Sequence, residues 1–233
     1  MITVRKANER GRGHYGWLNT HYSFSFAKYY DPRYMGVSAL RVINDDIIDA
    51  GAGFDTHGHR DMEIITYVTS GTIAHKDSVG NVTTLPAGEF QLMSAGRGIR
   101  HSEYNASDTE GLTLLQIWIE PNQFGGEPGY QQKAFGMREG LHEVITPDGR
   151  DGTLKIKQDA RLLHLLLQAN QTAEMNLGPQ RVAYVQLIKG RLKLNGVALE
   201  PGDGGAVQQV DQLVFASDGE AVEAIVFDLP PHS

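Results

Sequence analysis

Short runs of β-branched and aromatic residues recur along the whole chain, and Gly, Pro, Asn and Asp separate them at short intervals. Short strands bounded by such turn formers are typical of all-β sandwiches and barrels, whereas βαβ units need long helical patterns between the strands. Helical periodicity is scarce here, and we expect only a turn or two of helix near residues 29–34. The pattern therefore predicts an all-β protein, with strands such as A-L-R-V-I-N, E-I-I-T-Y-V, T-L-L-Q-I-W-I, V-A-Y-V-Q-L-I and V-E-A-I-V-F.

Residues 121–130, P-N-Q-F-G-G-E-P-G-Y, are rich in turn formers and have no periodic apolar pattern. We interpret them as a linker that divides the chain into domains 1–124 and 125–233. The two halves also resemble each other, because Tyr-Val followed by Gly and then by a turn with Pro and Gly occurs in both, Pro-Ala-Gly at 86–88 and Pro-Gly at 201–202. The two Tyr residues, Tyr67 and Tyr184, are 184 − 67 = 117 positions apart, about half the chain, which indicates duplication of one β-unit.

Composition excludes several classes of function. The chain has 21 Lys and Arg against 28 Asp and Glu, a formal charge of −7, and no long basic cluster, so we expect no nucleic-acid ligand. It has no cysteine, which removes disulfides, thiolate metal sites and cysteine nucleophiles. The first residues are polar, and no apolar run is long enough to cross a bilayer, so we expect a cytoplasmic protein without membrane contact.

Two pairs of metal-capable side chains, each with one residue between its members, are the main functional signal. They are His57 and His59 in F-D-T-H-G-H, and His101 and Glu103 in G-I-R-H-S-E. Residues two apart in a strand point to the same face, and neighbouring strands lie about 4.8 Å apart, so two such strands can surround one cation. Three imidazoles and one carboxylate leave two positions of a six-coordinate ion for water, dioxygen or a chelating oxygen. The alternative is a strand-end hydrogen bond between His101 and Glu103, with the other pair in a turn.

Other polar residues compete for a role near this site. Glu63 lies four residues after His59 in an apparent strand, and it could be a ligand, a hydrogen-bond partner behind the ligands, or a solvated residue. We rank the supporting position behind the ligands first. For single histidines such as His75 and His164, an ordinary hydrogen-bonded or surface position is the expected reading.

Several segments resemble the pirin family of the cupin superfamily. They are G-A-G-F-D-T-H-G-H-R-D-M-E-I-I-T-Y-V-T-S-G at 51–71 and P-A-G-E-F-Q-L-M-S-A-G-R-G-I-R-H-S-E at 86–103. The stretch W-L-N-T-H-Y-S-F-S-F-A-K-Y-Y at 17–30 resembles the bacterial pirin-like branch, whose members include quercetin 2,3-dioxygenases. The resemblance covers most of the first half.

This resemblance implies a bicupin, two double-stranded β-helix (jelly-roll) barrels of which the N-terminal one alone holds a metal. The implied ligands are His57, His59, His101 and Glu103. The usual cupin glutamate would fall near Glu63 and the histidine after Pro-x-Gly at Gln91, and the chain departs from that pattern as pirins do, so Glu63 is not counted as a ligand. The second half has no H-x-H, in keeping with a degenerate C-terminal barrel.

The activity implied by the resemblance is cleavage of the 2,3-bond of flavonols such as quercetin by dioxygen, with release of carbon monoxide. Glu103 would accept the proton of the 3-hydroxyl. The partners would be a small planar polyphenol and O2, and such a substrate needs an apolar slot. Phe54, Met93 and Trp118 are the candidates for its lining, and core packing is the alternative for each.

Two other functions stay open at this point. One is a non-catalytic metal or redox sensor that binds a protein partner, as some pirins resemble transcriptional cofactors. The other is a different cupin reaction, such as sugar isomerisation or oxalate breakdown. The resemblance favours Fe(II) as the one divalent ion per chain, while nitrogen and oxygen ligands also accept Ni, Co, Mn, Cu or Zn. The residues leave the physiological substrate and the oligomeric state open.

Overall fold

The computed structural model describes residues 1–232, and nearly all of its regular structure is β-strand. Two short 3-10 turns are the helical elements of this part of the chain: η1 (Ala7–Glu9) and η2 (Arg150–Gly152). The all-β prediction is thus confirmed. The helical turn expected at 29–34 is wrong, because this segment forms bends and tight turns. None of the helical segments among residues 1–232 has the length and apolar character needed to span a membrane.

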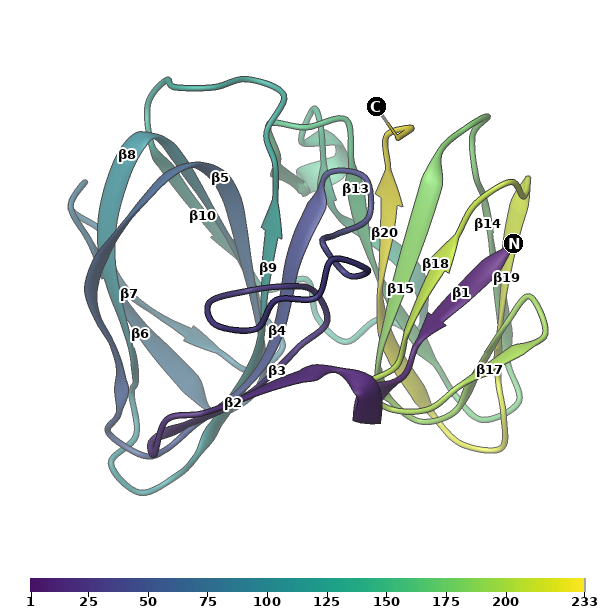
Figure 1. Cartoon of the computed structure of the whole chain (residues 1–233), viewed down its shortest axis with the longest axis horizontal. Coiled ribbons are helices and arrows are strands. Elements are labelled where there is room, and N and C mark those ends of the chain that lie inside the picture. Colours follow the sequence, from purple (N-terminus) through teal and green to yellow (C-terminus); the bar gives the residue numbers. More distant parts are fainter. Residues whose placement is uncertain (233) are drawn as a thin grey trace.

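The first half of the chain builds a nine-stranded sheet that curls into a barrel (Figure 1). Its order is β2-β3-β4-β9-β5-β8-β6-β7, with β10 also paired to β8, and every pairing is antiparallel. The strands are β2 (Gly11–His14), β3 (Leu18–Tyr22), β4 (Leu40–Ile48), β5 (Gly53–Ser70), β6 (Thr72–Asp77), β7 (Val82–Pro86), β8 (Phe90–Asn105), β9 (Leu112–Ile119) and β10 (Gly129–Lys133).

The second half builds a seven-stranded and a four-stranded sheet that face each other. The larger has the order β1-β18-β15-β20-β13-β11-β12 and the smaller β14-β19-β16-β17. The strands are β1 (Ile2–Arg5), β11 (Gly140–Thr146), β12 (Leu154–Lys155), β13 (Arg161–Leu167), β14 (Thr172–Asn176), β15 (Val182–Lys189), β16 (Leu192–Leu194), β17 (Val197–Leu199), β18 (Gly204–Val207), β19 (Gln212–Ser217) and β20 (Val222–Leu229).

Two strands pair with the half of the molecule to which they do not belong in sequence. β1, at the N-terminus, pairs with β18 of the second half, and Figure 1 shows the chain crossing from there to β2 in the first barrel. β10 follows the strand-free stretch 120–128 and returns to pair with β8 of the first barrel. The domain boundary between residues 124 and 125 stays a prediction.

The two matching Tyr-Val segments occupy equivalent places. Tyr67 lies in β5, between β8 and β9, and Tyr184 lies in β15, between β18 and β20. The Pro-Gly turn that follows in each half places a glycine, Gly88 or Gly202, at φ +88°, a left-handed conformation that glycine adopts without a steric penalty. The repeated sequence pattern therefore corresponds to a repeated strand arrangement.

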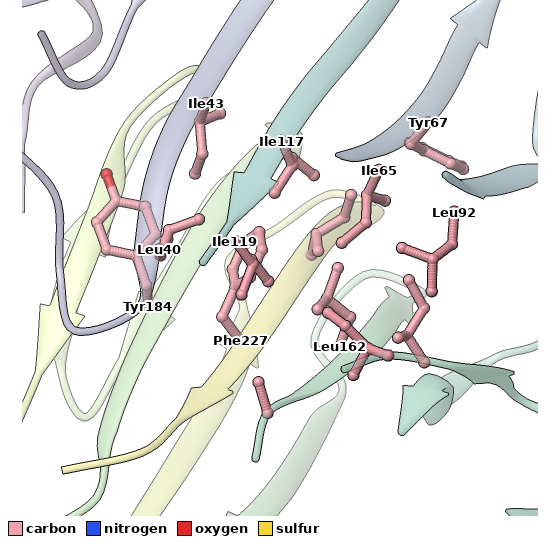
Figure 2. Packing of buried hydrophobic residues seen from close by; sticks show 14 of the residues in the cluster. Leu40, Ile43, Ile65, Tyr67, Leu92, Ile117, Ile119, Leu162, Tyr184 and Phe227 are labelled. Atoms are coloured by element: carbon pink, nitrogen blue, oxygen red, sulfur yellow. The ribbon is translucent and has the colours of Figure 1, made fainter. Parts of the chain in front are cut away.

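The largest hydrophobic cluster joins the two halves. Its buried side chains come from the first barrel and from the large sheet of the second half, as Figure 2 shows for Ile65, Ile117, Leu162, Tyr184 and Phe227. Because such interiors are packed as densely as organic crystals, this cluster fixes the first barrel against the second sheet.

Replacing Phe227 by alanine should lower the free energy of unfolding by about 3–5 kcal/mol, because it leaves a large cavity in this shared cluster. The Phe227 side chain has no exposed surface, and its ring centre lies 6.2 Å from that of Tyr184. Urea unfolding followed by fluorescence measures the change. The matched control is Phe124→Ala, since Phe124 is 73% exposed. A decrease in the free energy of unfolding below about 1 kcal/mol would contradict the assignment of Phe227 to the hydrophobic cluster shared by the two halves.

Candidate metal centre and cavity

The antiparallel pairing of β5 with β8 brings the two predicted pairs together. His57 lies directly opposite His101 in the register, and Phe54 lies opposite Glu103. The ladder is irregular on both sides of the histidines, between Phe54 and His57 and between His59 and Asp61. Such irregularities re-aim side chains locally, which is how three imidazoles come to converge on one point.

The three imidazoles present their Nε2 atoms to one another. His101 Nε2 lies 2.9 Å from Nε2 of His57 and 2.9 Å from Nε2 of His59. His57 Nδ1 lies 2.6 Å from the carbonyl oxygen of Asp55, so Nδ1 is the protonated nitrogen and Nε2 carries a lone pair. Three Nε2 atoms that face one point are the arrangement in which imidazoles bind a single cation. For bonds of about 2.1 Å, nitrogens at right angles around an ion are about 3.0 Å apart and tetrahedral ones about 3.4 Å, so the spacing of His101 from each of the other two fits neighbouring ligands of a six-coordinate ion.

Burial keeps these imidazoles in the form that binds a metal. It lowers the pKa of His59 to about 4, with a further lowering by the charge of His57. It likewise lowers the pKa of His101 to about 3, with His57 and His59 adding to the effect. Both rings are therefore neutral at pH 7, which is the state in which imidazole is a ligand.

Glu103 lies next to His101. Its Oε1 lies 3.7 Å from His101 Nε2 and accepts a long hydrogen bond, 3.4 Å, from Gln116 Nε2. Its Oε2 is buried without a hydrogen-bond partner among residues 1–232. Burial, followed by the charge of Asp46, raises the pKa of Glu103 to about 7. A buried carboxylate with one unpartnered oxygen next to His101 fits the oxygen ligand of a divalent cation held by the imidazoles.

A second buried histidine supports this arrangement from behind. His75, on β6, lies opposite Glu103 in the register, and its ring centre is 5.5 Å from that of His101. Its Nε2 is 2.7 Å from Asp77 Oδ2, and Asn81 holds the same carboxylate. An ordinary hydrogen-bonded or surface position is the expectation for His75, and the contact with Asp77 agrees with the hydrogen-bonded alternative, at a buried position. Within residues 1–232, the groups of metal-capable side chains, which include His75 with His101 and Glu103, all lie in the first half.

The metal-capable side chains open into a cavity of about 320 Å³, near the lower end of the usual range for small-molecule sites. His57, His59 and Glu103 form part of its wall. Apolar and aromatic residues form most of the rest: Leu18, Tyr22, Phe26, Phe54 and Trp118. Polar residues face it from β3, β4 and β9: Thr20, Asn44, Asp46 and Gln116.

The structure brings two of the three predicted lining residues to this cavity. Phe54 lies with its ring centre 6.3 Å from that of His57, and Trp118 lies 5.2 Å from His59. Met93 is not in the lining. It is fully buried in a small cluster with Ile64, Ala95 and Ile99, against which Trp118 packs.

Glu63 is placed away from the cavity lining. It has no exposed surface, and its Oε1 accepts hydrogen bonds from Ser94 Oγ at 3.0 Å and from the backbone N–H of Lys157 at 2.8 Å. The bond from Lys157 leads to the second half of the chain, and neither bond leads to the imidazoles. The predicted role behind the ligands therefore has no contact to support it, and the role that the contacts favour is joining the two halves.

Sequence reasoning missed the polar wall formed by Thr20, Asn44, Asp46 and Gln116. The available signal was the run N-D-D at 44–46 inside an otherwise apolar strand. Asp46 is almost completely buried, and burial raises its pKa to about 7. A carboxyl in such a place is a mark of a functional site.

Comparison with known proteins agrees with this architecture. Residues 3–119 match the model of the pirin family, and residues 143–229 match that of a quercetinase C-terminal cupin domain. The quercetin 2,3-dioxygenase of Escherichia coli (strain K12) is 50% identical over 231 residues, covering 99% of this chain and 100% of that protein.

Solved structures agree as well. YhhW from Escherichia coli is 50% identical and superposes with a TM-score of 0.97 over 100% of both chains. A second structure of YhhW, in complex with nickel(II), has a TM-score of 0.96 over 99% of this chain and 100% of that one. The two-barrel cupin architecture expected from the sequence is confirmed, and the chain belongs to the pirin family.

Proposed function

We propose that this protein is a metal-dependent dioxygenase that cleaves the 2,3-bond of flavonols such as quercetin with O2 and releases carbon monoxide. The observation that carries the proposal is the convergence of three imidazoles, with Glu103 next to His101, at the wall of a largely apolar cavity. The name of the 50% identical relative from Escherichia coli supports the choice of substrate class.

The residues suit a planar phenolic substrate. A divalent ion held by His57, His59, His101 and Glu103 would supply the positive charge that stabilises a deprotonated hydroxyl. Glu103 is buried at the cavity wall, and the carboxylate oxygen that does not hold the ion would accept the hydroxyl proton. Phe54 and Trp118 flank the histidines and would hold an aromatic ring system against them while excluding water.

These ligand types do not select one metal, so the affinity of the site and the availability of each metal decide which ion is bound. Nitrogen and carboxylate oxygen accept any of the divalent first-row metals, and affinity rises from Mn through Fe and Co to Ni and Cu. A pirin relative has been crystallised with nickel(II). We propose one divalent ion per chain, with iron and nickel as the first two to compare.

Metal-loaded protein should consume quercetin and O2 and release about one CO per O2, since the bond cleavage expels one ring carbon while O2 is incorporated. Oxygen uptake with an electrode, combined with CO trapping by haemoglobin, measures both. Removing the ion with a chelator should stop the reaction, and adding back iron or nickel should restore it. Uptake without CO, or uptake that survives chelation, would contradict the proposal, and metal binding without turnover would favour the sensor alternative.

A further inference from the structure

The cavity wall opposite the metal-capable side chains is polar and buried. It is formed by β3 and β4, which the curled sheet places across the cavity from β8, with β9 and β5 between them. Two residues of β4 stand out on this wall. Asn44 is 4% exposed and Asp46 is 3% exposed, and both line the cavity.

Among the described residues, the Asn44 side-chain oxygen lacks a hydrogen-bond partner, and Asp46 has only the neighbouring Thr20 hydroxyl and no cation to balance a charge. Asn44 Oδ1 is buried without a hydrogen bond in the described residues 1–232. Asp46 makes no ion pair in that same part of the chain, whereas its neighbour Asp45, on the other face of β4, binds Arg10 at 3.0 Å. An unsatisfied buried polar atom costs about 1–3 kcal/mol, and an apolar residue would avoid that cost. The wall therefore suits a ligand that supplies hydrogen-bonding groups of its own.

The chemistry of the wall selects the kind of group. Asn44 Oδ1 is an acceptor, and a carboxylate is also an acceptor. Burial raises the pKa of Asp46 to about 7, so at neutral pH part of the population can also donate a proton. A phenolic hydroxyl, which donates and accepts, satisfies both residues, whereas a bare aromatic edge satisfies neither.

We propose that Asp46 and Asn44 bind a second phenolic hydroxyl of the substrate, distinct from the one that meets the metal-capable side chains, and so select polyhydroxylated flavonols over unsubstituted 3-hydroxyflavone. The inference rests on the proposed function, because it takes a flavonol as the occupant of the cavity. It goes beyond that function because it names the residues that recognise the hydroxyl groups of the substrate and the subclass of flavonols that these residues favour.

Binding of quercetin and 3-hydroxyflavone to the nickel-loaded protein without O2 tests this inference, with calorimetry as the readout. Wild-type protein should bind quercetin about 10- to 100-fold more tightly, the range for a hydrogen bond to a charged or buried partner. Asp46→Ala should lose about 10-fold or more of the affinity for quercetin and leave that for 3-hydroxyflavone within about twofold. Asp46→Asn, which keeps a hydrogen-bonding group in place, should recover part of the loss.

Matched controls separate recognition from folding and from catalysis. Asp45→Asn changes the neighbouring carboxyl on the outer face and should leave both affinities unchanged. Nickel content and the thermal unfolding midpoint establish that each variant is folded and loaded. Equal affinities of wild-type protein for the two flavonols, or an equal loss for both in Asp46→Ala, would overturn the inference. If the hydroxyl-dependent binding holds while aerobic turnover is absent, the dioxygenase proposal fails and the recognition site stands.

Discussion

Replacing His101 by alanine is expected to abolish metal binding, with bound metal falling from one ion per chain to a trace. His101 is the imidazole that faces both other rings, with Nε2 2.9 Å from each of the two partner Nε2 atoms. Losing a hydrogen-bond partner behind a ligand already costs about 10- to 100-fold in metal affinity, so losing the central ligand should cost more. Elemental analysis of dialysed protein measures the effect, and flavonol turnover should disappear with the metal.

The fold should survive this change. His101 Nδ1 is buried without a hydrogen-bond partner in residues 1–232, so the ring gives the barrel little apart from packing. His14→Ala is the control, because His14 is exposed on β2 and should keep full metal content. Metal content near one ion per chain in His101→Ala would show that the ion sits elsewhere.

Replacing Glu103 by glutamine should leave the ion bound and slow turnover by about 100-fold or more, the scale of a lost proton acceptor. The three imidazoles remain, and glutamine keeps the shape of the side chain and one oxygen. What disappears is one carboxylate oxygen of a residue that lines the cavity and whose Oε2 has no hydrogen-bond partner in residues 1–232. Steady-state oxygen uptake gives kcat, and elemental analysis gives the metal content of the same sample.

The matched control for this change is Glu110→Gln, since Glu110 is exposed beyond the end of β8. It should retain wild-type kcat and metal content. A wild-type kcat in Glu103→Gln would exclude the carboxylate as proton acceptor, even with the ion in place.

The metal-capable group could be predicted from sequence because it depends on two local rules. Residues two apart share a face of a strand, and His57 with His59 and His101 with Glu103 obey that spacing. The pairing that joins them, His57 opposite His101, needs only that β5 and β8 be neighbours. Strand periodicity was therefore sufficient for each pair, and the pairing of β5 with β8 was the further assumption that joined the two pairs.

The burial of individual side chains and the contacts between distant segments could not be predicted in the same way. Met93 has the right chemistry for a pocket, but Trp118 packs against its cluster and forms the lining instead. Glu63 lies near the ligands in sequence, yet its hydrogen bonds reach Lys157. The pairing of β1 with β18 joins segments about 200 residues apart, and no local pattern encodes a contact of that kind.

The polar wall of the cavity shows the same limit. Asn44 and Asp46 belong to β4, far in sequence from the histidines, and only closure of the barrel places them on a shared cavity. Alternation along the strand does predict that Asp45 and Asp46 face opposite sides, which they do. Which of the two faces is the interior depends on the pairing of β4 with β3 and β9.

A crystal structure of protein loaded with iron or nickel, with anomalous diffraction collected at the edge of that metal, tests the central claim most directly. The account predicts one anomalous peak per chain in the first barrel, about 2.0–2.3 Å from Nε2 of His57, His59 and His101 and from a carboxylate oxygen of Glu103. A fully loaded protein with its peak elsewhere, or with no peak among these four side chains, would contradict it.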